Sequence, residues 1–119
     1  MNIQNINWNY PTSIWFGLNR IREIQKACND LNIKNPLIVT DPGLLQTDII
    51  NKINNSLNQS TEIYSNVQSN PTGQNVEEGV VQFNQNNHDG VIAVGGGSGM
   101  DTGKGIAFMS KQERPLWDF

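Results

Sequence analysis

After residue 17, the hydrophobic positions follow two patterns that alternate along the chain. In the first pattern they recur every three or four residues, as between Leu18 and Leu31, where charged side chains lie at positions between them. This spacing places one apolar stripe on a helix. It predicts helices over 18–31, 45–57 and 76–83, the second with Leu45 and Ile49 facing inward, and a fourth helix that follows Ser98 and ends near Met109.

In the second pattern, short apolar runs alternate with these helices. Residues 37–40, 62–67 and 90–94 have the length of strands, and the first of these runs has little polar interruption. Such runs are typical of strands covered on both faces, as in parallel sheets. An earlier segment, 8–16, is rich in aromatic and β-branched residues and predicts an extended strand or hairpin that ends at Gly17.

Strand and helix therefore alternate three times after the opening segment. This order predicts a Rossmann-like α/β fold, in which a parallel sheet carries helices on both faces and is preceded by an amino-terminal strand or hairpin. The 119 residues suit one such domain.

Charge and composition narrow the classes of partner. The net charge of −3 argues against nucleic acid. No apolar run approaches the ~20 residues of a membrane span, and the first residues lack the blocks of a signal peptide. A single cysteine, Cys28, cannot form an internal disulfide, so we expect the protein to lie in a reducing compartment. We expect the Cys28 side chain to be buried in the core. We therefore expect a cytoplasmic protein.

The strongest chemical signal is the run Gly95-Gly96-Gly97-Ser98-Gly99-Met100-Asp101, which follows an apolar strand and opens a helix. A helix amino terminus presents unpaired N–H groups at the positive end of the helix dipole, and a phosphate is the natural ligand there. Ser98 either adds a hydroxyl donor or caps the helix. The alternative is a tight turn without a ligand. The run lacks the Lys-Ser/Thr ending of a P-loop, which disfavours a nucleotide triphosphatase.

Three other residues have chemistry with competing explanations. Asp41 follows a predicted parallel strand, at the sheet edge where ligands bind. A carboxylate there can accept hydrogen bonds from a ribose diol and repel a 2′-phosphate. The alternative is that Asp-Pro-Gly forms an ordinary turn without a ligand. Asp101 is expected in the first helical turn, where it stabilises the dipole. His88 is the only histidine and is expected in a solvated loop. One histidine makes a poor metal site, and no catalytic triad can be assembled.

Five segments carry a family pattern: Ile14-Trp15-Phe16-Gly17, Leu37-Ile38-Val39-Thr40-Asp41, Asn70-Pro71-Thr72, Gly95–Lys104 and Arg114-Pro115-Leu116-Trp117-Asp118-Phe119. Together they resemble the start of the iron-containing (group III) alcohol dehydrogenases, and the resemblance covers nearly the whole chain.

The resemblance implies a set of cofactor-binding residues and no catalytic or metal-binding ones within this chain. Asp41 would bind the adenosine ribose, Asn70 would lie against the cofactor, and Asp101 would lie near the nicotinamide end. Gly96, Gly97 and Ser98 would form the diphosphate loop. The expected cofactor is NAD, with NADP less favoured because of Asp41.

For a complete enzyme, the resemblance implies metal-assisted hydride transfer between an alcohol and its aldehyde or ketone. In that family one aspartate and three histidines of a helical second domain bind the metal, iron or zinc, and no such domain follows here. Residues 1–119 are therefore expected to be an incomplete dinucleotide-binding domain, inactive alone. Two large aromatic residues near the end of the chain also suggest that the natural protein continues. The aromatic opening segment can pair with another chain, which leaves a homo-oligomer open.

Three alternative functions stay open at this point. The first is another enzyme of similar fold, such as a glycerol dehydrogenase or a dehydroquinate synthase-like lyase. The second is a module that binds a nucleotide without chemistry, and the third is a protein-interaction domain. Ser98 and the Asn-Pro-Thr segment favour the alcohol dehydrogenase branch.

Overall fold

A small parallel sheet forms the centre of the computed structural model, which describes residues 4–9, 12–68, 72–114 and 116–118. The secondary-structure elements, in chain order, are β1 (Ile6–Asn9), β2 (Ser13–Phe16), the 3-10 helix η1 (Arg20–Glu23), α1 (Ile24–Asp30), β3 (Pro36–Thr40), the 3-10 helix η2 (Leu44–Gln46), α2 (Ile49–Ser56), β4 (Ile63–Tyr64), α3 (Gly73–Gln85), β5 (Gly90–Val94), α4 (Gly97–Met109) and the 3-10 helix η3 (Leu116–Asp118).

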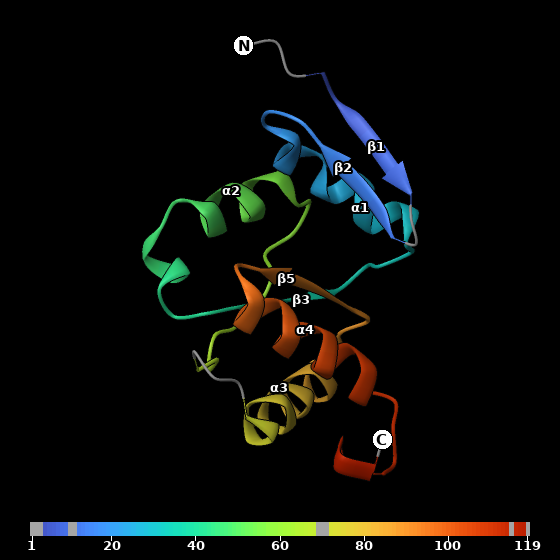
Figure 1. Cartoon of the computed structure of the whole chain (residues 1–119), viewed down its shortest axis with the longest axis vertical. Coiled ribbons are helices and arrows are strands. Elements are labelled where there is room, and N and C mark those ends of the chain that lie inside the picture. Colours follow the sequence, from blue (N-terminus) through green and yellow to red (C-terminus); the bar gives the residue numbers. More distant parts are fainter. Residues whose placement is uncertain (1–3, 10–11, 69–71, 115, 119) are drawn as a thin grey trace.

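The sheet has the order β4-β3-β5, and both strand pairs are parallel. Its central strand, β3, is buried along its whole length. Since helices follow each strand and cover both faces (Figure 1), the predicted Rossmann-like α/β fold is confirmed. The strand expected over 62–67 is only two residues long, because the chain turns at Ser65, whose carbonyl accepts the N–H of Val67 at 2.8 Å.

Successive side chains of β3 enter two separate cores. Leu37 and Val39 face the layer of α3 and α4, whereas Ile38 faces α1 and α2. This alternation is the two-residue period of a strand. The first core contains Leu37, Val39, Tyr64, Val67, Val76, Phe83 and Ile106, and the second contains Cys28, Ile38, Ile50, Ile53, Leu57 and Ile92. Cys28 is therefore buried, as expected.

Some helices, and the buried faces they carry, are shorter than the apolar spacing predicted. Leu18 and Leu31 are 63% and 72% exposed because η1 and α1 cover only residues 20–30 between them. Leu45 and Ile49, expected to face inward, are 43% and 37% exposed. The second helix begins only at Ile49, and Leu45 lies in η2, so neither residue shares the buried face of α2.

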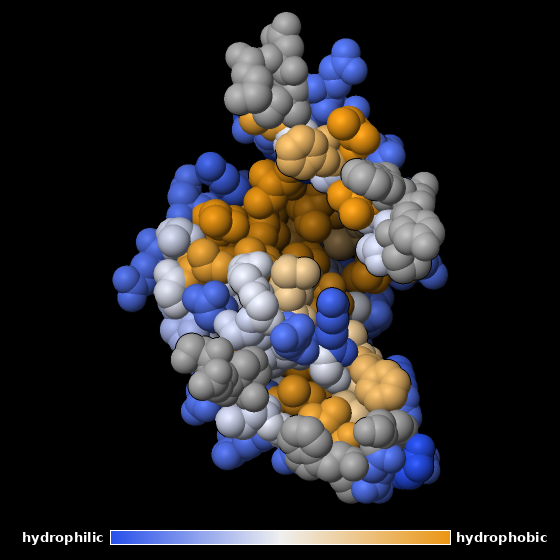
Figure 2. Space-filling view, in the orientation of Figure 1, coloured by the Kyte–Doolittle hydropathy of each residue, from blue (hydrophilic) through white to orange (hydrophobic). Residues whose placement is uncertain are grey.

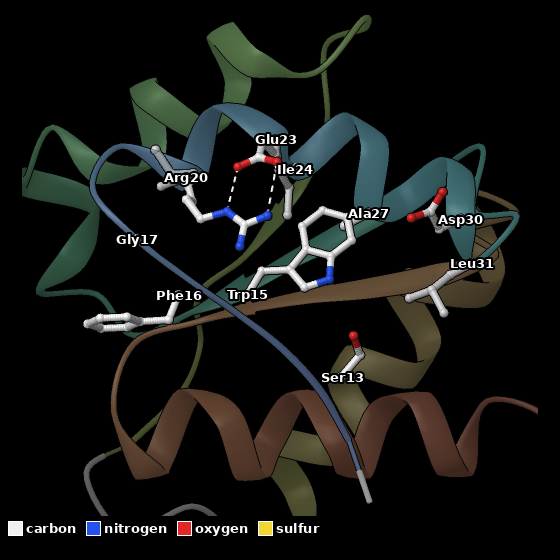
Figure 3. A pocket seen from close by; sticks show the side chains of 11 residues that line it. Ser13, Trp15, Phe16, Gly17, Arg20, Glu23, Ile24, Ala27, Asp30 and Leu31 are labelled. Carbon is white, nitrogen blue, oxygen red and sulfur yellow. Dashed lines mark hydrogen bonds and ion pairs between the residues drawn. The ribbon is translucent and has the colours of Figure 1, made fainter. Parts of the chain in front are cut away.

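The opening segment forms the predicted hairpin, with β1 antiparallel to β2. Arg20 holds this hairpin to the first helices: its guanidinium donates to the Ile6 carbonyl and to Asn7 Oδ1, both at 2.7 Å, and to Glu23 at 2.6 Å. The hydrogen bond from Arg20 lowers the pKa of the Glu23 carboxyl. The Trp15 ring points toward α1 (Figure 3). Arg20 Cζ lies 5.2 Å and Lys26 Nζ 5.3 Å from the centroid of this ring, within the range of a cation–π interaction.

A pocket of about 510 Å³ lies between the hairpin and α1. Its walls include Trp15, Ile24 and Ala27, and Figure 2 shows a hollow with hydrophobic walls in the upper half of the molecule, where the hairpin lies. Within the described residues, no helix has the length and apolar character needed to cross a membrane.

Candidate functional site

The carboxyl ends of β3 and β5 meet at one edge of the sheet. Thr40 pairs with Val94, the last residue of β5, and the Thr40 hydroxyl donates to the Val94 carbonyl at 2.9 Å. Asp41 and Gly95 therefore leave the sheet side by side. The carboxyl edge of a parallel sheet is where ligands bind in open α/β folds.

Gly95 makes the turn from β5 toward α4 in a conformation that suits glycine. Its φ is 131°, a region that residues with a side chain rarely adopt. A β-carbon added at Gly95 would lie 3.1 Å from Asp41 Oδ2 and 3.0 Å from Leu44 Cδ1. The glycine backbone thus lies directly against the Asp41 carboxylate.

The next two glycines border open space. Gly96 is the N-cap residue of α4, and the cap carries no side-chain hydrogen bond. A β-carbon added at Gly96 or at Gly97 would meet no atom within 4 Å. The first helical bond runs from Met100 N–H to the Gly96 carbonyl at 3.1 Å, so the N–H groups of residues 97–99 have no partner within the helix. This cradle of main-chain donors fits the diphosphate of a dinucleotide.

Gly99 brings the helix end close to the sheet. A β-carbon there would lie 2.9 Å from the Val94 carbonyl oxygen and 3.9 Å from the Asp41 nitrogen. Both neighbours are backbone atoms, so the helix has to carry glycine at this position to approach the strands this closely. The approach places the amino terminus of α4 over the ends of β3 and β5.

Asp41 takes part in the Asp-Pro-Gly turn, which is one of the two explanations that its sequence context left open. Its Oδ1 accepts the Leu44 N–H at 3.1 Å, and the Asp41 carbonyl accepts the same N–H at 3.2 Å, which is the Asp-Pro-Gly turn. Its Oδ2 faces the Gly95 backbone. One carboxylate oxygen is thus used in the turn while the other lies at the open glycine junction.

The remaining predicted residues have different positions. Ser98 is half-buried in the first turn of α4 and does not cap the helix, which excludes the capping explanation. Asp101 is exposed and lies beyond the first turn, so the expected interaction with the helix dipole in that turn is wrong. Asn70 lies outside the described residues.

The chain on either side of 69–71 is well anchored. Thr72 is the N-cap of α3 and forms a capping box with Asn75, whose backbone N–H donates to Thr72 Oγ1 at 3.2 Å. The Tyr64 hydroxyl donates to the Asn75 carbonyl at 2.6 Å. Burial raises the pKa of Tyr64 to about 12, so the phenol remains a donor at neutral pH.

Sequence reasoning missed two contributors to this edge and misplaced one residue elsewhere. The Thr40 hydroxyl bond to Val94 and the approach of Gly99 to the Asp41 backbone each link residues more than 50 positions apart, and only the run of glycines signalled such a close approach. His88 was expected in solvent but is 6% exposed. It lies between α3 and β5, where residues before β3 and β4 cover its ring.

No group of three or more histidine, cysteine, aspartate or glutamate side chains suited to a metal occurs among residues 4–9, 12–68, 72–114 and 116–118. Polar side chains at or near the glycine junction include Asp41, Ser98 and, farther along α4, Asp101. This set offers a carboxylate and main-chain donors for a nucleotide.

Comparison with known proteins gives a consistent result. A sequence profile described as "Iron-containing alcohol dehydrogenase" matches residues 11–119. "Alcohol dehydrogenase 4" of Schizosaccharomyces pombe is 33% identical over 112 residues, which are 92% of this chain and 26% of that protein.

Two solved structures are similar to the chain. The crystal structure of a 1,3-propanediol oxidoreductase superposes with a TM-score of 0.83 and 34% identity, over 87% of this chain and 28% of that one. The NADH-dependent butanol dehydrogenase A of Thermotoga maritima superposes with a TM-score of 0.79 and 25% identity, over 87% of this chain and 27% of that one. The chain thus spans little more than a quarter of the length of these relatives.

Proposed function

Because this chain belongs to the iron-containing alcohol dehydrogenase family, we propose that it forms the dinucleotide site of an NAD-dependent alcohol oxidoreductase. One observation carries the proposal: the amino terminus of α4 opens onto free space at Gly96 and Gly97, at the sheet edge where Asp41 also lies. In this proposal the N–H groups of residues 97–99 and the Ser98 hydroxyl bind the diphosphate, and no residue of the chain is catalytic.

Asp41 selects the cofactor in this proposal. Its Oδ2 accepts a hydrogen bond from the adenosine ribose, and its negative charge repels a 2′-phosphate. Asn70 lies against the cofactor and Asp101 lies toward the nicotinamide. NAD is therefore preferred over NADP. Replacing Asp41 by glycine is expected to narrow the ratio of the two dissociation constants, and an unchanged ratio would argue against this role.

Calorimetric titration of the 119-residue chain with NAD tests the diphosphate site. The variant Gly97→Ala places a methyl group in the open space without touching the fold. We expect it to weaken NAD binding by about tenfold, the equivalent of ~1.4 kcal/mol, with an unchanged unfolding midpoint. Val81→Ala, which shortens an exposed side chain on α3, is the matched control and is expected to bind like the parent chain. Absence of NAD binding by the parent chain, or equal binding by Gly97→Ala, would exclude the site.

For the whole protein we propose metal-assisted hydride transfer between a small alcohol and its aldehyde or ketone. The nicotinamide, when bound, exchanges the hydride, and the residues of this chain hold the cofactor in place. The names of the relatives, which include an alcohol dehydrogenase and a 1,3-propanediol oxidoreductase, support this class of reaction.

We further propose that residues 1–119 are an incomplete dinucleotide-binding domain, and that a helical domain encoded downstream binds iron or zinc. The share of the relatives that the chain spans supports this organisation. The genomic sequence after codon 119 tests it, because a histidine-bearing helical segment is expected there and an immediate stop codon would refute it. Purified residues 1–119 are expected to oxidise no short alcohol.

The hairpin is the part of the chain that we propose to pair with a second copy. Ile6, Ile14 and Phe16 lie on one face of it and are 50%, 45% and 58% exposed. Residues 1–19 contain no charged side chain, whereas exposed strand edges are usually protected by charges. Sedimentation equilibrium should detect a dimer that Ile14→Lys dissociates and that Leu45→Lys, an exposed control on η2, leaves intact. A monomeric parent chain would refute pairing.

We also propose a cytoplasmic location without nucleic-acid or membrane partners. The net charge of −3 and the single buried cysteine support it. Fractionation of cells that express the tagged protein provides the test, and recovery in the membrane fraction would contradict it.

A further inference from the structure

The outer edge of β5 is unpaired among the residues that the structure describes. β5 pairs with β3 along one edge, and no described strand lies along the other. The strand, Gly90–Val94, contains no charged residue and no proline. Proteins usually protect an exposed strand edge with charges, proline or a bulge, because an unprotected edge pairs with another strand. This edge therefore has the composition of a strand that receives a neighbour.

The register of the sheet identifies the backbone groups at that edge. The Ile38 N–H donates to the Glu62 carbonyl, on the β4 side of β3. Backbone groups alternate in direction along a strand, so the residues on either side of Ile38 bond to β5. The parallel register then assigns alternate residues of β5 to β3. The N–H and C=O groups of Val91 and Ala93 consequently point away from β3, toward the unpaired side.

The faces on which the helices lie specify where the next parallel strand belongs. The connection through α2 leads from β3 to β4 on the Ile38 face of the sheet, and the connection through α3 leads the opposite way, from β4 past β3 to β5, on the Leu37 face. Both connections therefore have the same hand, and such crossovers are right-handed. Because α4 lies on the same face as α3 (Figure 1), a right-handed crossover through α4 ends beyond β5.

α4 carries an apolar flank on the side of this free edge. Ile106 faces α3, and Gly103 lies over β5, where an added β-carbon would be 2.7 Å from Ala93 Cβ. Met100 and Ala107 lie about one turn before and after Gly103, on the flank of α4 that faces away from α3. Both are exposed. A strand beside β5 would cover this flank.

The opposite face of the edge borders the hollow beneath the hairpin. Ile92 of β5 belongs to the core against which Ile21 and Ile24 pack. These two isoleucines also line the hollow of about 510 Å³, whose walls are hydrophobic (Figure 2). A strand beside β5 would therefore meet apolar surroundings on both of its faces, as β3 does.

From these placements we propose that the outer edge of β5 is the docking site of a strand from the polypeptide that follows residue 119 in the natural protein. The strand pairs parallel to β5 through the backbone groups of Val91 and Ala93, and its side chains are apolar on both faces. This inference rests on the proposed incompleteness of the chain, which spans little more than a quarter of its relatives. The docked strand extends the carboxyl edge of the sheet and adds a wall beside the glycine junction.

Amide hydrogen exchange measures whether the edge is free. In the 119-residue chain, the amides of Val91 and Ala93 should exchange about 100-fold faster than the amide of Ile92, which bonds to β3. In the full-length protein, encoded by the same reading frame continued past codon 119, the three amides should exchange at similar, slow rates. The docked strand then accepts the two outward N–H groups.

Proline substitution supplies a second test, because proline lacks an N–H and is tolerated in a sheet only at an edge. Ala93→Pro should leave Tm of the 119-residue chain nearly unchanged. In the full-length protein it should lower Tm by roughly 5 °C or more, since the docked strand loses a hydrogen bond and meets the proline ring. Ile92→Pro removes an N–H that faces β3, so this control variant should unfold both chains.

Four outcomes would overturn the proposal. Two concern the full-length protein: fast exchange at Val91 and Ala93, or a change in Tm from Ala93→Pro equal to that in the 119-residue chain. The third is slow exchange of both amides in the 119-residue chain, and a dimer in sedimentation equilibrium would then assign the edge to a second copy. The fourth is a stop codon directly after residue 119. Calorimetric titration with NAD tests the nucleotide site separately, so NAD binding together with a free β5 edge in the full-length protein would refute this inference alone.

Discussion

Replacing Gly99 by alanine is the sharpest test of how α4 sits on the sheet. The new β-carbon would lie 2.9 Å from the Val94 carbonyl oxygen, closer than real β-carbons approach a backbone atom. That oxygen also accepts the Thr40 hydroxyl at 2.9 Å and ends the strand β5. The clash can be relieved only by moving the helix end or the strand end, and the second movement breaks the bond to Thr40.

The magnitude follows from three contributions. Inserting a methyl group into a packed contact costs about 1–3 kcal/mol, and losing the Thr40 hydrogen bond costs about 1 kcal/mol. Alanine in place of glycine within a helix returns about 1 kcal/mol. The free energy of unfolding of Gly99→Ala should therefore fall by about 1–3 kcal/mol, which lowers the urea midpoint by roughly 1 M for a usual slope.

Urea unfolding followed by far-ultraviolet circular dichroism measures this change. Gly97→Ala, two residues away in the same helical turn, is the matched control because its added β-carbon meets no atom within 4 Å. Its midpoint should equal or slightly exceed that of the parent chain. Equal stability of Gly99→Ala and Gly97→Ala would refute the close approach of α4 to the ends of β3 and β5.

Three further changes probe the interior. Tyr64→Phe removes the hydroxyl that donates to Asn75 and should lower the free energy of unfolding by about 1 kcal/mol. Because burial raises the pKa of Tyr64 to about 12, the stabilisation by this phenol is complete below pH 10 and is lost toward pH 12. Tyrosinate absorbance from both tyrosines of the folded chain at pH 10 would contradict this pH dependence. Burial also raises the pKa of the Cys28 thiol, so a disulfide reagent at pH 8 should react slowly with the folded chain and rapidly in urea, and equal rates would refute that burial. Ile106→Ala empties a fully buried site and should cost about 2–5 kcal/mol in urea unfolding, whereas Leu31→Ala, 72% exposed, should change little; similar losses would contradict the assigned core.

The period of the apolar residues was enough to predict most of the secondary structure and the fold class. The uninterrupted apolar character of β3 predicted a strand with two covered faces, and the glycine run after β5 predicted an exposed helix start. Both are local features, because a few adjacent residues set the covering of a strand and the conformation of a turn. The family resemblance rests on the same short segments.

Exposure at the ends of the elements was harder to predict. Leu18, Leu31 and Leu45 continue an apolar spacing but lie outside the helices to which that spacing assigned them. A helix ends where its caps and neighbours end it, and hydrophobic residues beyond that point do not share its buried face. The apolar pattern contains no information about those neighbours.

The sequence by itself determined the alternation of strands and helices, the parallel sheet and the glycine-rich start of α4, since each follows from residues that are neighbours in the chain. Only the tertiary structure decided that Asp41 lies against Gly95, that Gly99 lies beside the Asp41 backbone, and that His88 is buried between two acceptors. These contacts join residues from about 26 to 58 positions apart. Their formation depends on strand order and on how closely a helix packs on the sheet, which no local pattern of residues specifies.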